Sequence, residues 1–144
     1  MTAQAHAASP FVILYVEDDP DIRELVTVAL ELDEGVRVVG CQAGGSDAVE
    51  MARAWHPQVI LLDVMLPGVD GPRTLELLRA DPATSGIPAI FITAKAATSD
   101  VSRLNGLGAL GVIRKPFDPM SLLAKIHELI GAAGHEKASV GAGH

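Results

Sequence analysis

Apolar residues along the chain alternate between short continuous runs and longer stretches with helical spacing. The continuous runs favour buried strands, which we predict at 11–16, 36–39, 59–62, 88–93 and 110–113. Apolar positions three and four residues apart predict helices at 19–32, 48–55, 72–80, 99–107 and from Asp118 onward. Asp19 before Pro20 supplies a helix start, with an N-cap acid followed by proline in the first turn. Five strands and five helices therefore alternate strictly.

The continuous apolar character of the predicted strands indicates a sheet that is covered on both faces. Strands of a parallel sheet are buried in this way, and the helices between them form the covering layers. We predict one α/β domain with a five-stranded parallel sheet over residues 11–131, after a flexible leader at 1–10 and before a disordered tail at 132–144. In such sheets, ligands bind beyond the carboxyl ends of the strands.

Polar side chains stand at the ends of several predicted strands, where such a ligand would bind. Glu17 and Asp18 follow the first strand, and Asp63 follows the third. Thr93 ends the fourth strand, and Lys115 comes shortly after the fifth. Carboxylates that meet at one edge repel one another, which raises some of their pKa values. A divalent cation reverses this effect, and Mg²⁺ prefers a few carboxylate ligands together with several waters.

The same set of side chains suits phosphate chemistry. A metal ion held by acids on one side can bind phosphate oxygens on the other. Lys115 can then interact with the remaining oxygens through its charge, and the Thr93 hydroxyl can form a hydrogen bond to them. Asp63 is the lone acid at the end of the central strand. It is therefore the candidate nucleophile, which would form an aspartyl phosphate.

Composition and charge narrow the class of protein. The 144-residue chain has a formal net charge of −7 and no run of Lys or Arg, which argues against contact with nucleic acid or an anionic membrane. No apolar stretch approaches the roughly 18–20 residues of a membrane span, and the N-terminus lacks the positive region of a signal peptide. The single cysteine, Cys41, suits a reducing compartment. We therefore expect a cytoplasmic protein.

Four motifs in this order resemble those of a known family. They are "VEDDPDIREL", "LLDVMLPGVDG", "FITAK" and "KPFDP", at 16–25, 61–71, 91–95 and 115–119. Over residues 11–131, the chain resembles the receiver domains of bacterial two-component response regulators. The resemblance implies the CheY-like, flavodoxin-like (βα)5 fold, with strand order 2-1-3-4-5 and a cis peptide bond between Lys115 and Pro116.

The resemblance also implies a metal site at these acids. The family binds Mg²⁺ or Mn²⁺, so the corresponding positions are expected to be its ligands here. Asp18 and Asp63 would bind the ion directly, and Glu17 would bind it through water. The backbone carbonyl of Met65 would complete the protein ligands.

By the same resemblance, phosphate would pass from a protein donor to Asp63. The donor would be the phosphohistidine of a sensor histidine kinase or of a phosphotransfer protein. Thr93 would bind the phosphoryl group, and Lys115 would pair with Asp63 or its phosphate. The side chains of Met65 and Lys95 would flank the phosphate. The chain would then catalyse its own phosphorylation and dephosphorylation, without being a conventional enzyme.

One position departs from the family pattern, and it affects how activation would be passed to a downstream protein. The family usually has an aromatic switch residue three positions before the lysine, and this chain has Val112 there. Valine is stiff at χ1 and cannot change between exposed and buried rotamers as an aromatic does. We expect a stand-alone receiver that signals to a downstream protein through residues 99–130, a surface assigned by analogy with the family.

Three alternatives stay open from the sequence. The chain could be a phosphorylation-independent interaction module with a receiver fold, which Val112 favours mildly, or a receiver fragment of a longer regulator. It could also be a Mg²⁺-dependent phosphatase acting on small molecules through Asp63. Haloacid-dehalogenase-like enzymes of that kind place an acid two residues after the nucleophile, and Met65 in this position cannot transfer protons.

Overall fold

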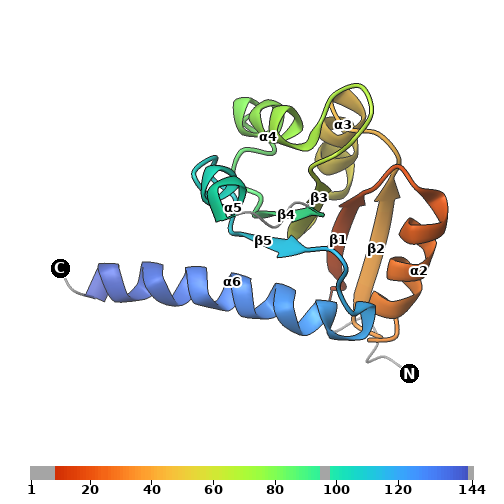
Figure 1. The fold of residues 1–144 in the computed structure, drawn as a ribbon. Helices are drawn as coiled ribbons and strands as arrows, with labels where there is room; N and C mark the ends of the chain where they lie inside the picture. Colours follow the sequence, from red (N-terminus) through yellow and green to blue (C-terminus); the bar gives the residue numbers. More distant parts are fainter. Residues whose placement is uncertain (1–8, 95–97, 143–144) are drawn as a thin grey trace.

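The computed structural model describes residues 9–94 and 98–142 of the chain. Strands and helices alternate through these residues, as predicted (Figure 1). In chain order they are β1 (Phe11–Val16), α2 (Pro20–Leu30), β2 (Val36–Cys41), α3 (Ser46–Trp55), β3 (Val59–Asp63), α4 (Gly71–Ala80), β4 (Ala89–Thr93), α5 (Thr98–Asn105), β5 (Gly111–Arg114) and α6 (Pro119–Ala142).

The five strands form one parallel sheet in the order β2-β1-β3-β4-β5, which confirms the predicted fold. Its register aligns the ends of neighbouring strands. Leu62 at the end of β3 pairs with Val16 of β1, and Asp63 pairs with Ile92 of β4. Residues that follow β1, β3 and β4 are therefore brought to a single edge of the sheet, although they are far apart in sequence.

Two apolar layers cover the two faces of the sheet. On one face, residues of α3, α4 and α5 pack against the strands, with Ala52, Leu78 and Leu104 among the buried side chains. On the other face, α2 and α6 do the same with Val26 and Ile126. Because side chains alternate along a strand, consecutive residues of β1 belong to different layers. This explains why the strands are continuously apolar.

Helices α2 and α4, which follow the strands that end in the acids, have side-chain caps at their first turns. Asp19 accepts hydrogen bonds from the backbone N–H groups of Asp21 and Ile22, at 2.9 and 3.2 Å. Asp70 accepts one from Arg73 at 3.0 Å and begins α4. Such caps satisfy backbone donors that have no partner inside the helix. They hold the loops after β1 and β3 where the acids lie.

Helix α6 corrects one expectation from the sequence. It continues to Ala142 and extends beyond the rest of the fold (Figure 1), so residues 132–142 are helical where a disordered tail was expected. The segment contains no proline, and it includes Ala, Glu and Lys, which are good helix formers. Extending an existing helix also avoids the cost of nucleation. Domain boundaries at residues 10 and 131 stay predictions.

Within the described residues, none of the helices combines the length and the hydropathy that crossing a membrane requires. The peptide bond between Lys115 and Pro116 is cis, as the resemblance implied.

Candidate functional site

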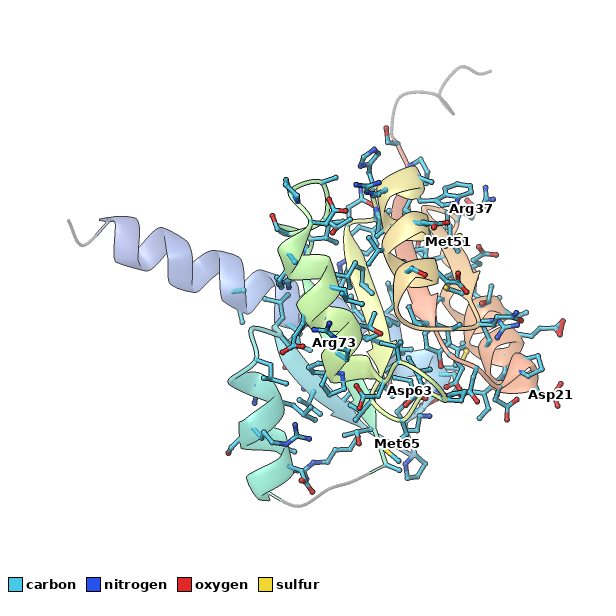
Figure 2. All side chains as sticks on the ribbon, turned by 90° about the horizontal axis from the view of Figure 1, so that it is seen from above. Asp21, Arg37, Met51, Asp63, Met65 and Arg73 are labelled. Atoms are coloured by element: carbon cyan, nitrogen blue, oxygen red, sulfur yellow. The ribbon has the colours of Figure 1, made fainter. Side chains whose placement is uncertain are left out.

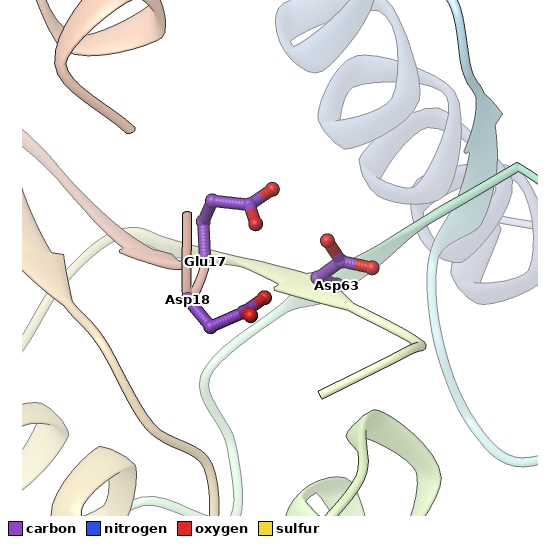
Figure 3. Close-up of side chains that lie close together, drawn as sticks. All are labelled: Glu17, Asp18 and Asp63. Atoms are coloured by element: carbon purple, nitrogen blue, oxygen red, sulfur yellow. The ribbon is translucent and has the colours of Figure 1, made fainter. Parts of the chain in front are cut away.

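Three carboxylates converge at the carboxyl edge of the sheet. One oxygen each from Glu17, Asp18 and Asp63 lies within 4.8 Å of the others, and the three groups face a common space (Figure 3). Glu17 is 2% exposed and Asp63 is 4% exposed, while Asp18 is open to solvent. Buried carboxylates require charged or hydrogen-bonding partners, since a bare buried charge is strongly destabilising.

Lys115 supplies a positive charge to two of these groups. Its Nζ lies 2.8 Å from Asp63 Oδ2 and 3.3 Å from Glu17 Oε1. Burial by itself would lower the pKa of Lys115, but the hydrogen bond and charge of Asp63, followed by those of Glu17, outweigh it and raise the pKa. Lys115 is therefore charged at neutral pH and compensates the two most buried acids.

Backbone N–H groups orient the two buried carboxylates. Met65 donates to Asp63 Oδ1 at 3.1 Å, and Asp19 donates to Glu17 Oε2 at 3.1 Å. Figure 2 shows Asp63 and Met65 together at one edge of the fold, with Arg37 toward the opposite edge. Each buried acid thus has one oxygen on the backbone and one near Lys115, so both side chains are restrained before any ligand binds.

Thr93 lies at the same edge, on the neighbouring strand. It is the last residue of β4, is 1% exposed, and follows Ile92, the register partner of Asp63. Its backbone carbonyl accepts a hydrogen bond from the Lys115 N–H at 2.8 Å, which ties the end of β4 to the loop after β5. All five side chains predicted for the site are therefore at one edge. Lys95, expected beside the phosphate, lies outside the described residues.

The donor set fits a hard divalent cation. All three side chains offer carboxylate oxygens, the ligands that Mg²⁺ and Mn²⁺ favour, and no soft sulfur or imidazole ligand accompanies them among the described residues. The exposure of Asp18 leaves one side open to water, which suits Mg²⁺ because this ion retains several waters.

Three residues of this site did not emerge from the sequence. Tyr15 Oη donates to Glu17 Oε1 at 3.4 Å, and Arg23 donates to the Glu17 backbone carbonyl at 2.6 Å. Gly71 packs against the backbone of Asp63, where a Cβ would lie 2.4 Å from the Asp63 carbonyl oxygen. The position of Tyr15, two residues before Glu17 in an otherwise apolar strand, was the available signal. Arg23 and Gly71 depend on contacts that only the folded chain makes.

Comparison with known families gives this geometry a context. A family model described as the response regulator receiver domain matches residues 13–127. The chain belongs to this family. It is a receiver domain of the two-component systems, whose receivers interact with histidine kinases.

Curated relatives of this receiver are longer response regulators. The DNA-binding response regulator MtrA of Mycolicibacterium smegmatis is 40% identical over 116 residues, which cover 79% of this chain and 48% of MtrA. The nitrate/nitrite response regulator protein NarP of Escherichia coli is 40% identical over 127 residues, which cover 88% and 57%. This receiver thus spans about half the length of the curated relatives it matches. Because one of them is named as DNA-binding, the expected absence of nucleic-acid contact stays a prediction.

Solved receiver structures share the fold over nearly their full length. Chemotaxis protein CheY4 of Vibrio cholerae superposes with a TM-score of 0.75 at 26% identity, covering 85% of this chain and 99% of that one. The receiver domain of a DNA-binding response regulator from Colwellia psychrerythraea 34H gives 0.73 at 30% identity, covering 84% and 98%. The fold prediction is therefore supported independently of the sheet order.

The position of Val112 is also clear in this receiver. It lies in β5, pairs in register with Phe91 of β4, and is half-buried against the layer formed by α3, α4 and α5. A valine at this position contacts the core through its branched Cβ, and it has no ring that could reach solvent or the acid site.

Proposed function

We propose that this receiver accepts a phosphoryl group on Asp63 from a protein phosphohistidine, in a reaction that depends on Mg²⁺. One observation carries the proposal. The buried Asp63 carboxylate lies 2.8 Å from Lys115 and shares a space with two further acids, a combination that serves no packing purpose. Burying charges is costly, and clusters of buried ionisable groups are concentrated at functional sites.

The residues divide the chemistry between them. An oxygen of Asp63 forms the new bond to phosphorus as the phosphorus–nitrogen bond of the donor imidazole breaks. The electron pair of that bond stays on the imidazole nitrogen. Lys115, already charged, would neutralise phosphoryl oxygens, and the Thr93 hydroxyl at the neighbouring strand end would donate a hydrogen bond to them.

Glu17, Asp18 and Asp63 would hold the metal ion, together with the backbone carbonyl of Met65. When bound, Mg²⁺ would reduce the repulsion between the incoming phosphoryl group and the carboxylates. In the absence of the ion, Lys115 is the cation that compensates Asp63 and Glu17.

The decisive experiment is intact-protein mass spectrometry after incubation with acetyl phosphate and Mg²⁺. We expect one phosphoryl adduct on the unmodified chain, no adduct with EDTA, and none on Asp63→Asn, which keeps the shape of the side chain. Asp47→Asn is the matched control, because Asp47 is an exposed acid on α3 outside the site. An adduct that persists on Asp63→Asn would contradict the assignment. Failure of the unmodified chain to form any adduct would favour a phosphorylation-independent interaction module.

An apolar pocket beside the site supports a protein as the natural donor. It has a volume of about 330 Å³ and lies between α2 and the start of α6. Its lining includes Ile22, Leu25, Phe117 and Pro119, together with Lys115 of the site. Leu25 is 59% exposed. Apolar surface this close to the phosphoacceptor suits a docked protein better than a small phosphodonor.

This docking surface is tested by comparing two kinds of donor. Leu25→Asp is expected to slow transfer from autophosphorylated histidine kinases about tenfold and to leave labelling by acetyl phosphate unchanged. Leu32→Asp is the control, because Leu32 is equally exposed but lies beyond the end of α2 and outside the pocket. If Leu25→Asp and Leu32→Asp accept phosphate from the kinases at equal rates, the donor protein docks outside this pocket. The stand-alone output through residues 99–130 stays a prediction.

A further inference from the structure

The one tyrosine of the chain is buried beside the acid site. Tyr15 is fully buried in β1, and its ring packs in the apolar layer between the sheet and helices α2 and α6. A buried phenol usually has a hydrogen-bond partner for its hydroxyl group. Here the hydroxyl donates to Glu17 Oε1 at 3.4 Å.

The strand geometry explains this contact. Side chains two residues apart in extended chain project from the same face, so Tyr15, near the end of β1, and Glu17, just after it, lie on one side of the sheet. The ring of Tyr15 packs in the apolar layer, and its hydroxyl reaches the carboxylate just beyond the end of the strand. Phenylalanine or leucine would fill the same apolar space without reaching the carboxylate.

The Glu17 carboxylate accepts hydrogen bonds from three donors, and these donors differ in their other contacts. Asp19 N–H bonds Oε2 at 3.1 Å, while Lys115 Nζ and Tyr15 Oη both approach Oε1, at 3.3 and 3.4 Å. Lys115 is shared with Asp63, to which it lies closer, at 2.8 Å. A phosphoryl group on Asp63 would draw Lys115 further toward Asp63. Tyr15 is fully buried, so it would continue to restrain Glu17 in that state.

We propose that Tyr15 is a positioning residue, whose hydroxyl holds the Glu17 carboxylate toward the metal site and thereby sets the affinity of this receiver for Mg²⁺. The inference rests on the proposed function, because it assumes that Glu17 serves a metal ion. Partners that orient a metal-binding carboxylate typically change metal affinity when they are removed. Tyr15 acts through Glu17 and does not itself contact the ion.

The first test uses Tyr15→Phe, which removes the hydroxyl and keeps the ring. Mn²⁺ affinity is measured directly by electron paramagnetic resonance, and the Mg²⁺ dependence of labelling by acetyl phosphate is measured in parallel. We expect the Mn²⁺ dissociation constant and the half-saturating Mg²⁺ concentration to rise about three- to tenfold, because Glu17 keeps two other donors. The rate at saturating Mg²⁺ should change less than about twofold. Unchanged metal affinity would overturn the proposal.

A double-mutant cycle separates positioning from general destabilisation. With Glu17→Gln in place, Tyr15→Phe should produce no further change in Mn²⁺ affinity, because its target carboxylate is already gone. Equal losses in both backgrounds would show that Tyr15 acts on the fold and not through Glu17, and would contradict the proposal.

A second measurement needs no variant of Tyr15. Because the chain has one tyrosine, ¹³Cζ-labelled tyrosine gives a single NMR resonance from the unmodified protein. We expect this resonance to shift when Mg²⁺ saturates the protein and to stay in place in Glu17→Gln. A resonance that does not respond to Mg²⁺ in the unmodified protein would overturn the proposal. Absence of a phosphoryl adduct would instead refute only the proposed function, since the metal titrations do not depend on phosphorylation.

Discussion

Two regions of this receiver are built on different principles. The edge proposed to accept phosphate, here called the phosphoacceptor edge, comprises Glu17, Asp18, Asp63, Thr93 and Lys115. It contains buried charges with partners at 2.8 to 3.4 Å. The α5–β5 side, residues 98–114, has short elements and a glycine-containing connection between them. Helix α5 has eight residues and β5 has four, and β5 alternates between buried and less buried positions.

This difference allows one edge of the domain to be rigid while the α5–β5 side can shift. Buried charges require particular partners in particular directions, so the phosphoacceptor edge tolerates little displacement. Apolar contacts are not directional, and an element with few of them can shift at low cost. On the α5–β5 side, Leu104 is the fully buried apolar side chain of α5 among the described residues. We therefore expect perturbations at the phosphoacceptor edge to cost more free energy of unfolding than matched ones on the α5–β5 side.

The largest contrast is expected for two buried glycines. A Cβ at Gly71 would lie 2.4 Å from the Asp63 carbonyl oxygen and 2.8 Å from Val64 Cα, both backbone atoms that cannot move freely. A Cβ at Gly111 in β5 would lie 2.9 Å from Leu129 Cδ2, the tip of a side chain that can rotate. We expect Gly71→Ala to lower the free energy of unfolding by about 3 kcal/mol and Gly111→Ala by about 1 kcal/mol. Urea unfolding measures both, and Gly86→Ala, which meets no neighbour within 4 Å, is the control.

The second contrast compares the stability lost when a cationic side chain is removed from each region. Lys115→Met leaves two buried carboxylates without their lysine, and we expect a loss of about 2 kcal/mol in EDTA, reduced from the fully buried case because the Lys115 side chain is 25% exposed. Arg103→Met on exposed α5 should change stability by less than about 0.5 kcal/mol. Equal losses in thermal or urea unfolding would mean that Lys115 does not compensate the acids.

The third contrast is the response to Mg²⁺. A ligand that binds only the folded state stabilises it by RT ln(1 + [L]/Kd), which is about 1.4 kcal/mol at ten times Kd. We expect this gain for the unmodified protein and for Asp100→Asn on α5, and we expect it to be largely lost in Asp18→Asn. Melting curves with Mg²⁺ and with EDTA measure the difference. A gain that survives Asp18→Asn would place the ion elsewhere.

The smallest contrast is in alkaline solution. Burial, and then the charges of Glu17 and Asp63, raise the pKa of Tyr15 above its usual value near 10. Above that pH the unfolded chain releases the tyrosine proton while the folded chain keeps it, so stability falls as pH rises. We expect Tyr15→Phe to reduce the loss between pH 9.5 and 11 by about 1 kcal/mol, as measured by urea unfolding at each pH. If the unmodified protein and Tyr15→Phe lose the same free energy of unfolding over this range, other groups, Lys115 among them, cause the loss of stability in alkaline solution.

The fold and most of the site could be predicted from local patterns. Continuous apolar strands separated by amphipathic helices specify a covered parallel sheet, and polar residues at strand ends identify one edge as the site. Asp63, Thr93 and Lys115 were assigned in this way because their positions depend only on where the strands end. The course of residues 132–142 was predicted wrongly, because the weak composition signal of a tail was outweighed by extension of an existing helix.

The sequence by itself determined which residues reach the phosphoacceptor edge, since each follows a continuous apolar strand and the carboxyl ends of parallel strands meet at one edge of the sheet. Tertiary structure alone decided what holds them there. The contact of the Tyr15 hydroxyl with Glu17 follows from their spacing along one strand, but the guanidinium of Arg23 on the Glu17 carbonyl and the close approach of Gly71 to Asp63 arise between separate elements. Such contacts depend on how helices pack on the sheet to within a fraction of an ångström, and hydrogen bonds and steric contacts are sensitive to distance on that scale.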